Sequence, residues 1–155
     1  MITQIKKIRS TQSDGQDPVT ERIIGHCFRV HRTLGPGFPE KVYQAALFME
    51  LEKMRFQVQR ERAYNVLFEN EPVGQFHVDL LVDKSVIVEV KAVTGPMPTV
   101  FSAQLLAYLK AAQLPVGLLV NFGNPSCQVK RVVLSSAKSS FRPASYSGES
   151  AKSPI

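Results

Sequence analysis

Hydrophobic residues recur at helical spacing in three stretches of the chain. In the first, Ile23, Cys27 and Val30 share one face, and Asp17-Pro18 supplies an N-cap and a first helical residue before them. Gly35-Pro36-Gly37 ends this helix. The same spacing predicts two further helices, over about residues 39–54 and 99–112.

Apolar runs of strand length predict five strands. The first, over residues 56–68, is close to alternation. Two more flank a polar turn within residues 76–93, and the last two cover residues 116–122 and 129–134. The first three strands form a meander, and the helix before the fourth returns the chain for a parallel pairing. We therefore expect an α/β (α+β) fold, a mixed sheet with flanking helices.

Three charged residues interrupt the apolar runs of the second and third strands. They are Asp79, Glu89 and Lys91, and a buried charge is costly unless it is paired or binds an ion. Alternation puts Glu89 and Lys91 on one face of their strand. If the turn between the strands has three residues, with Val82 opposite Val86, Asp79 falls opposite Glu89, about 5 Å away between Cβ atoms.

Alternation on the second strand also groups its side chains. It puts His77, Asp79 and Leu81 on one face, and Val78 and Leu80 on the other.

Two explanations of these charges stay open at this point. One is a charged cluster on a solvated sheet face, with Lys91 neutralising one acid. The other is a cation site, because two hard carboxylates on neighbouring strands suit Mg²⁺. No cluster of cysteine and histidine has the spacing of a zinc site.

Polar residues break the apolar pattern at two further places. Glu40 opens the second helix and lies three and seven residues before Tyr43 and Leu47, which predicts a shared inward face. Its alternative role is to complement the helix N-terminus. Gln104 and Tyr108 lie four residues apart on the third helix and either form a solvated stripe or face a ligand beside the sheet.

Composition limits the function classes. The 155 residues suit one domain, and 19 Lys and Arg against 13 Asp and Glu give a charge of +6, which favours a polyanionic partner. Two distant cysteines, no signal peptide and no bilayer-length apolar run predict a cytoplasmic protein without a membrane partner. We expect a polar N-terminal arm over 1–16, one domain over 17–134 and a disordered Ser-rich tail over 135–155.

The ordered set of motifs resembles a known family. The stretch GFPEKVY, residues 37–43, matches Gly-x-x-Glu-x-x-Tyr, and Asp79, Glu89-x-Lys91 and Gln104-x-x-x-Tyr108 follow. This set, over residues 19–134, resembles the GxxExxY protein family within the PD-(D/E)XK nuclease superfamily. The superfamily core is restriction-endonuclease-like, with helix, three strands, helix and strand in order. Val78 stands where the superfamily signature has proline.

The resemblance implies a metal-dependent nuclease that hydrolyses phosphodiester bonds. Asp79, Glu89 and the backbone carbonyl of Val90 would hold Mg²⁺ or Mn²⁺, which would polarise the phosphate and acidify a water. Lys91 would orient the water or stabilise developing charge, and Glu40 would complete the acidic cluster. The remaining pair, Gln104 and Tyr108, would position the substrate.

Partners and alternatives follow from the same reasoning. The expected partner is nucleic acid, with DNA favoured over RNA, and the oligomeric state stays open, a dimer included. Four basic residues, scattered and either solvated or lining a backbone groove, are Arg60, Arg62, Lys130 and Arg131. The competing hypothesis is a module that binds nucleic acid or protein, keeps the nuclease fold and does not cleave. A structural protein with an ion-pair network is the third hypothesis.

Overall fold

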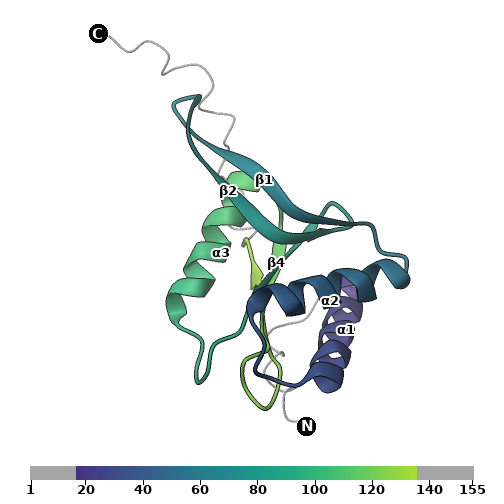
Figure 1. Cartoon of the computed structure of the whole chain (residues 1–155). Coiled ribbons are helices and arrows are strands. Elements are labelled where there is room, and N and C mark those ends of the chain that lie inside the picture. Colours follow the sequence, from purple (N-terminus) through teal and green to yellow (C-terminus); the bar gives the residue numbers. More distant parts are fainter. Residues whose placement is uncertain (1–16, 136–155) are drawn as a thin grey trace.

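The computed structural model describes residues 17–135, so the predicted N-terminal arm and the segment 136–155 of the predicted tail lie outside the described residues. The helices are α1 (Pro18–Leu34), α2 (Glu40–Lys53) and α3 (Thr99–Ala112) (Figure 1). The strands are β1 (Val58–Phe68), β2 (Glu71–Val82), β3 (Val86–Lys91), β4 (Val116–Asn121) and β5 (Gln128–Val133). None of the helices within residues 17–135 is both long and apolar enough to cross a membrane.

The ends of α1 are the predicted ones. The Asp17 carboxylate accepts a hydrogen bond from the Val19 N–H at 3.1 Å, and Pro18 takes the first helical position. Gly35 ends the helix at φ +72°, a left-handed value that favours glycine, and its N–H donates to the His31 carbonyl. Helix α2 starts one residue later than predicted, because Pro39 occupies the N-cap position.

The five strands form one mixed sheet in the order β1-β2-β3-β4-β5. Strands β3 and β4 are parallel, and the neighbouring pairs are antiparallel. The parallel pair results from the crossover through α3, as the order of elements predicted. The mixed sheet with flanking helices confirms the predicted fold class.

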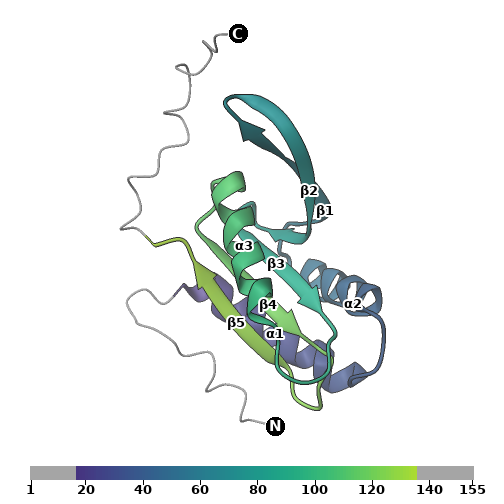
Figure 2. The same ribbon diagram turned by 90° about the vertical axis from the view of Figure 1, so that its left-hand side faces the viewer.

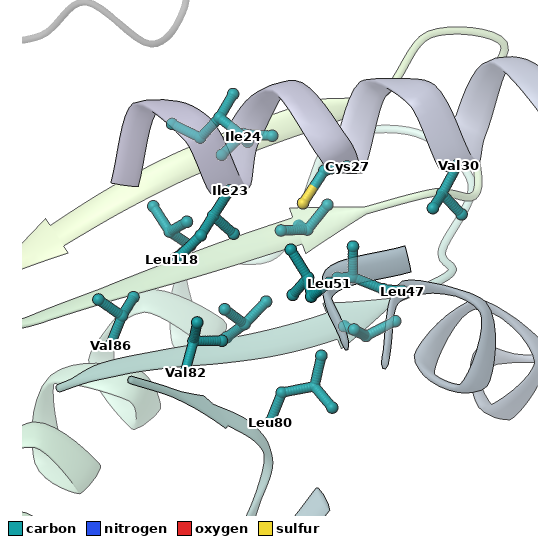
Figure 3. Close-up of a cluster of buried hydrophobic side chains, with 14 of the residues drawn as sticks. Ile23, Ile24, Cys27, Val30, Leu47, Leu51, Leu80, Val82, Val86 and Leu118 are labelled. Atoms are coloured by element: carbon teal, nitrogen blue, oxygen red, sulfur yellow. The ribbon is translucent and has the colours of Figure 1, made fainter. Parts of the chain in front are cut away.

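Helices cover both faces of the sheet (Figure 2). Helices α1 and α2 pack on one face, where Ile23, Leu47 and Leu118 are fully buried in the larger apolar cluster (Figure 3). Helix α3 packs on the other face, where Leu105 and Leu109 join a smaller cluster. Alternation along β3 divides it between the two, with Val86, Val88 and Val90 facing α1 and α2.

The β2–β3 hairpin has the predicted register, with Val82 opposite Val86 and Leu80 opposite Val88. The faces of β2 differ from the prediction, because Val78 packs in the α3-side cluster and Leu80 in the opposite one. Simple alternation would have kept these two side chains together, so the strand turns over at Asp79 between them.

The β1–β2 hairpin is bent at the same place. Arg60 pairs with Leu80 and Arg62 pairs with Val78, which leaves Glu61 and Asp79 out of the ladder. Glu61 has φ +51°, a left-handed value that non-glycine residues rarely adopt in a strand. Beyond this bend, residues 62–68 and 71–78 form a hairpin that curves away from the sheet (Figure 2). We call this hairpin the arm; it is distinct from the predicted N-terminal arm.

Candidate active site at the bend of the hairpin

The bend brings the two predicted carboxylates together through the backbone. The Asp79 N–H donates to Glu89 Oε2 at 3.0 Å, and the Val90 N–H donates to Asp79 Oδ2 at 2.8 Å. Each acid therefore accepts from the strand of the other, in place of ordinary ladder bonds. This exchange fixes both carboxyl groups beside each other at the point where β2 leaves β3.

Burial makes this pair electrostatically unfavourable. Burial, and next the neighbouring charge of Asp79, raise the pKa of Glu89 to about 8, against an ordinary value of 4.5. Burial also raises the pKa of Asp79, while the hydrogen bond from the Val90 N–H acts in the opposite direction. Without a counter-charge the two carboxyl groups thus resist simultaneous ionisation.

Lys91 supplies positive charge to the site without pairing with either acid. Its charge lowers the pKa values of both Asp79 and Glu89, yet among residues 17–135 no carboxylate lies within 4.0 Å of its ammonium. The Lys91 Nζ instead lies 4.5 Å from the ring centroid of Phe101 on α3. Lys91 thus acts on both acids through its charge but forms a salt bridge with neither.

Glu40 lies at the start of α2 and is exposed. Tyr43 and Leu47 are fully buried, so the predicted inward face includes them and excludes Glu40. The negative charge of Glu40 contributes to raising the pKa of Glu89, as the weakest of the contributions. Glu40 is thus near enough for its charge to act on Glu89, while its side chain lies in solvent.

The glycine and tyrosine of the Gly-x-x-Glu-x-x-Tyr motif have structural roles. The Tyr43 hydroxyl donates to the Gly35 carbonyl and accepts from the Phe38 N–H at 3.2 Å, which holds the loop between α1 and α2. The Tyr43 ring stacks on Phe122 with centroids 4.7 Å apart. Gly37 has φ +116° in this loop, a conformation that side chains disfavour. The motif therefore fixes where α2, and with it Glu40, begins.

Of the two predicted positioning residues on α3, Tyr108 lies close to the acids. Burial, and then the charges of Glu89 and Asp79, raise its pKa. Its ring stacks on Phe76 of β2 with centroids 4.2 Å apart, which joins α3 to the arm. Gln104, one turn earlier, is exposed.

Two residues that contact the acid pair or its neighbours were not predicted from the sequence. Gln44 is buried on α2, and its Nε2 lies 3.1 Å from Asp79 Oδ1 and 3.2 Å from Glu61 Oε2. Glu61, at the bend of β1, also forms an ion pair with Lys41. The available signal for Gln44 was its spacing of four residues from Glu40, which puts both on one side of α2.

Asn121 was missed as well, and it fixes the chain directly after Lys91. Its side chain is fully buried, accepts from the Val93 N–H at 2.9 Å and donates to the Val93 carbonyl at 3.0 Å. This is the hydrogen-bond pattern of a neighbouring strand, supplied by one amide. Gly123 packs so closely on the same segment that an added Cβ would lie 2.5 Å from the Val93 oxygen.

The basic residues proposed for a common groove lie apart. Arg60 and Arg62 belong to β1, whereas Lys130 and Arg131 belong to β5, at the opposite edge of the sheet. Of the two alternatives, the separation favours scattered residues over one groove that all four line. A pocket of about 460 Å³ lies between the arm and α3, with Leu67, Ala107 and Lys110 in its lining, and it includes neither acid of the pair.

The oxygen atoms of Asp79 and Glu89 are candidate ligands for a divalent cation. Within residues 17–135, no three His, Cys, Asp or Glu side chains are grouped so that they could hold a metal ion. The pair itself offers two hard carboxylates, and their raised pKa values mark a place where positive charge is lacking. Mg²⁺ usually takes one or two carboxylates and completes its shell with water and substrate phosphate. The residues fit a cation bound in that way.

Comparison with known proteins agrees with this arrangement. A family model described as the PD-(D/E)XK nuclease superfamily matches residues 17–132, which is most of the chain. Curated protein sequences gave no match. With an acid on β2, Glu-x-Lys on β3 and the mixed sheet that carries them, this chain belongs to the PD-(D/E)XK nuclease superfamily.

Proposed function

We propose that the chain is a metal-dependent nuclease that hydrolyses phosphodiester bonds, and that it belongs to the GxxExxY family within its superfamily. One observation carries the proposal: two carboxyl groups, each hydrogen-bonded to the strand of the other, lie beside a lysine that has no carboxylate partner among residues 17–135. A sheet kept only for its architecture gains nothing from this buried charge.

Asp79, Glu89 and the backbone carbonyl of Val90 would hold a divalent cation, Mg²⁺ or Mn²⁺. Such an ion, when bound, supplies positive charge for the scissile phosphate and lowers the pKa of a coordinated water. The raised pKa values of both acids support this assignment, because a cation would stabilise their ionised forms. The hydrogen bonds from the Asp79 and Val90 amides orient the two groups in advance.

The proposed role of Lys91 is to hold the attacking water or stabilise the negative charge that grows on the phosphate. Phe101 fixes the ammonium at 4.5 Å without neutralising it, so its positive charge remains available to a phosphate. The rigid segment after Lys91, fastened by Asn121, limits the positions that its backbone can adopt.

We assign roles to three further residues. Glu40 would complete the acidic cluster, directly or through a water. Tyr108 would position the nucleic-acid backbone. The charges of both acids raise the pKa of its hydroxyl, and its ring is stacked on Phe76. Gln104 would contact substrate from the exposed flank of α3. The charge of +6 favours a nucleic acid as substrate.

The test is cleavage by purified protein of linear DNA, circular DNA and RNA, with Mn²⁺ or Mg²⁺ and with EDTA. We expect metal-dependent cleavage that Lys91→Ala lowers by about 100- to 1,000-fold while Mn²⁺ binding stays nearly unchanged. Glu89→Ala should lose both cleavage and Mn²⁺ binding, because few protein oxygens remain. Lys84→Ala, in the exposed turn of the same hairpin, is the matched control and should cleave normally.

Two results would contradict the proposal. Wild-type protein that binds Mn²⁺ but cleaves no substrate would support the non-cleaving binding module in its place. Cleavage that survives both Lys91→Ala and Glu89→Ala would show that the activity has another source.

A further inference from the structure

Gln44 is a neutral side chain among charged side chains at the bend. Its amide is buried, and it contacts three charged residues from two strands. The Nε2 group donates to Asp79 Oδ1 at 3.1 Å and to Glu61 Oε2 at 3.2 Å, and Oε1 accepts from Arg60 at 3.0 Å. Both amide protons and the amide oxygen are thus used.

The charges around Gln44 permit only one orientation of its amide. If the amide were flipped, Oε1 would face the carboxylates of Asp79 and Glu61, and Nε2 would face the Arg60 guanidinium. Acceptors would then meet acceptors, and donors would meet a donor. The two acids and the arginine therefore determine which end of Gln44 faces Asp79.

This orientation completes the fixation of the Asp79 carboxylate. Oδ1 accepts from Gln44 and Oδ2 accepts from the Val90 N–H, so each oxygen has one defined donor and keeps a lone pair. The donor from α2 is neutral. A lysine or arginine at the same place would orient Asp79 equally well but would also neutralise it, and the acid would then attract a cation less.

We propose that Gln44 is a positioning residue of the active site: it orients the Asp79 carboxylate for a divalent cation without neutralising it, and Arg60 acts through Gln44 by fixing the amide. This inference rests on the proposed function for its cation, and on the hydrogen bonds alone for its geometry. It gives α2 a part in the site through a buried residue, in addition to the exposed Glu40.

The first measurement is Mn²⁺ affinity by calorimetry, without substrate. Gln44→Met removes both hydrogen bonds with little change in size and should weaken Mn²⁺ binding by about 10- to 100-fold, as loss of a residue that orients a ligand usually does. Arg60→Met should weaken it less. The double variant should match Gln44→Met alone, because Arg60 acts through Gln44.

Matched controls separate this effect from general loss of structure. Arg62→Met removes a guanidinium from the same strand that contacts Gln59 and Tyr64 but not Gln44, and it should bind Mn²⁺ as the wild type does. Gln75→Met removes an exposed glutamine that bonds to Asn65, and it should also be unchanged. Melting temperatures of all variants are recorded in parallel.

The second measurement needs no metal. The Val90 amide donates to Asp79, so its proton resonance reports the orientation of that carboxylate. Gln44→Met and Arg60→Met should both shift the Val90 amide resonance in metal-free protein, and Arg62→Met should not. Amides at the alternate positions of β3, such as Ile87, point toward β4 and serve as the internal reference.

The outcomes distinguish this inference from the proposed function. If wild-type protein binds no Mn²⁺, the cation of the proposed function is lost, and the Val90 resonance still decides whether Gln44 orients Asp79. If Gln44→Met leaves both the Val90 resonance and Mn²⁺ affinity unchanged, the inference is overturned. If Gln44→Met does not fold, exposed Arg60 decides: an Arg60→Met variant with an unmoved Val90 resonance overturns the inference.

Discussion

The two faces of the sheet differ in the size of their apolar clusters and in the charged residues that they carry. Among the described residues, 19 buried side chains form the cluster under α1 and α2, and six form the cluster under α3. On β3 the first face receives Val86, Val88 and Val90, and the second receives Ile87, Glu89 and Lys91. The two charged residues of β3 therefore lie on the face with the smaller apolar cluster.

The difference shows how the fold tolerates a buried acid pair. Burying an ionisable group costs free energy, and this cost must be offset elsewhere in the domain. The large cluster provides that offset because its apolar contacts are continuous through α1, α2 and four strands (Figure 3). The α3 face then remains free to expose a site at the bend of β2.

The largest expected effect compares one leucine from each cluster. Leu47→Ala, under α2, should lower the free energy of unfolding by about 3–5 kcal/mol, because a rigid cluster cannot close the cavity. Leu109→Ala, under α3, should cost about 2–3 kcal/mol, because the side chains of a smaller cluster can relax into the space. Urea unfolding at neutral pH measures both, and equal losses would contradict the proposed division between the faces.

The next effect concerns pH and the α3 face. The folded state keeps the Glu89 proton to a pKa of about 8, whereas the unfolded chain releases it near 4.5. The folded state binds the extra proton between these values, so this contribution to stability is complete below about pH 4.5 and is lost as the pH rises toward 8. Each pH unit within this range lowers the free energy of unfolding by about 1.4 kcal/mol at most. Metal-free wild-type protein should therefore lose stability over this range.

Two variants identify the source of that pH dependence. Glu89→Gln keeps an acceptor for the Asp79 N–H and cannot ionise, so its stability should change less with pH than that of the wild type. Glu52→Gln, on the exposed part of α2, should keep the wild-type slope. Unfolding in urea from pH 5 to pH 8, with EDTA, gives the comparison, and identical slopes for all three proteins would refute it.

A smaller effect is expected for the Tyr43 hydroxyl, a polar group on the α1 and α2 side of the sheet. Tyr43→Phe keeps the stacked ring but leaves the Gly35 carbonyl and the Phe38 N–H without their partner. The loss should be about 1–3 kcal/mol in the free energy of unfolding. Mn²⁺ affinity should stay within a few-fold, since no ligand of the cation is removed. A large loss of affinity at unchanged stability would instead give Tyr43 a direct place in the site.

The sequence predicted the elements well and the bend poorly. Periodicity located the helices and strands, and the three-residue turn gave the register of Val82 and Val86, because these features depend on neighbours in sequence. The bend depends on a left-handed Glu61, and no local signal distinguishes this residue from others in an alternating strand. The faces of Val78 and Leu80 were therefore assigned wrongly.

The candidate site shows the same limit. Asp79, Glu89 and Lys91 stood out because a charge within an apolar run is conspicuous, and they do lie together. Gln44 is neutral and occupies an unremarkable helical position, and its contacts are made across the fold to Asp79 and Glu61. Such contacts become visible only when α2 is placed against the bend.

The smallest expected effect concerns the contact between Lys91 and the ring of Phe101 on α3. Phe101 lies 4.5 Å below the Lys91 ammonium, and a contact of this kind contributes about 0.5–1 kcal/mol. Phe101→Leu alone also loses ring packing, so the contact is isolated by a double-mutant cycle with Lys91→Met. The coupling free energy in urea unfolding should be about 0.5–1 kcal/mol and should decrease little with added salt, because the partner of the ammonium carries no net charge.

If the coupling is near zero, the ring does not hold Lys91, and the ammonium must be oriented by another group before it can serve a phosphate. If the coupling is larger and strongly salt-dependent, Lys91 pairs with a carboxylate in solution, and the contrast between the two faces of the sheet is weaker than the structure implies.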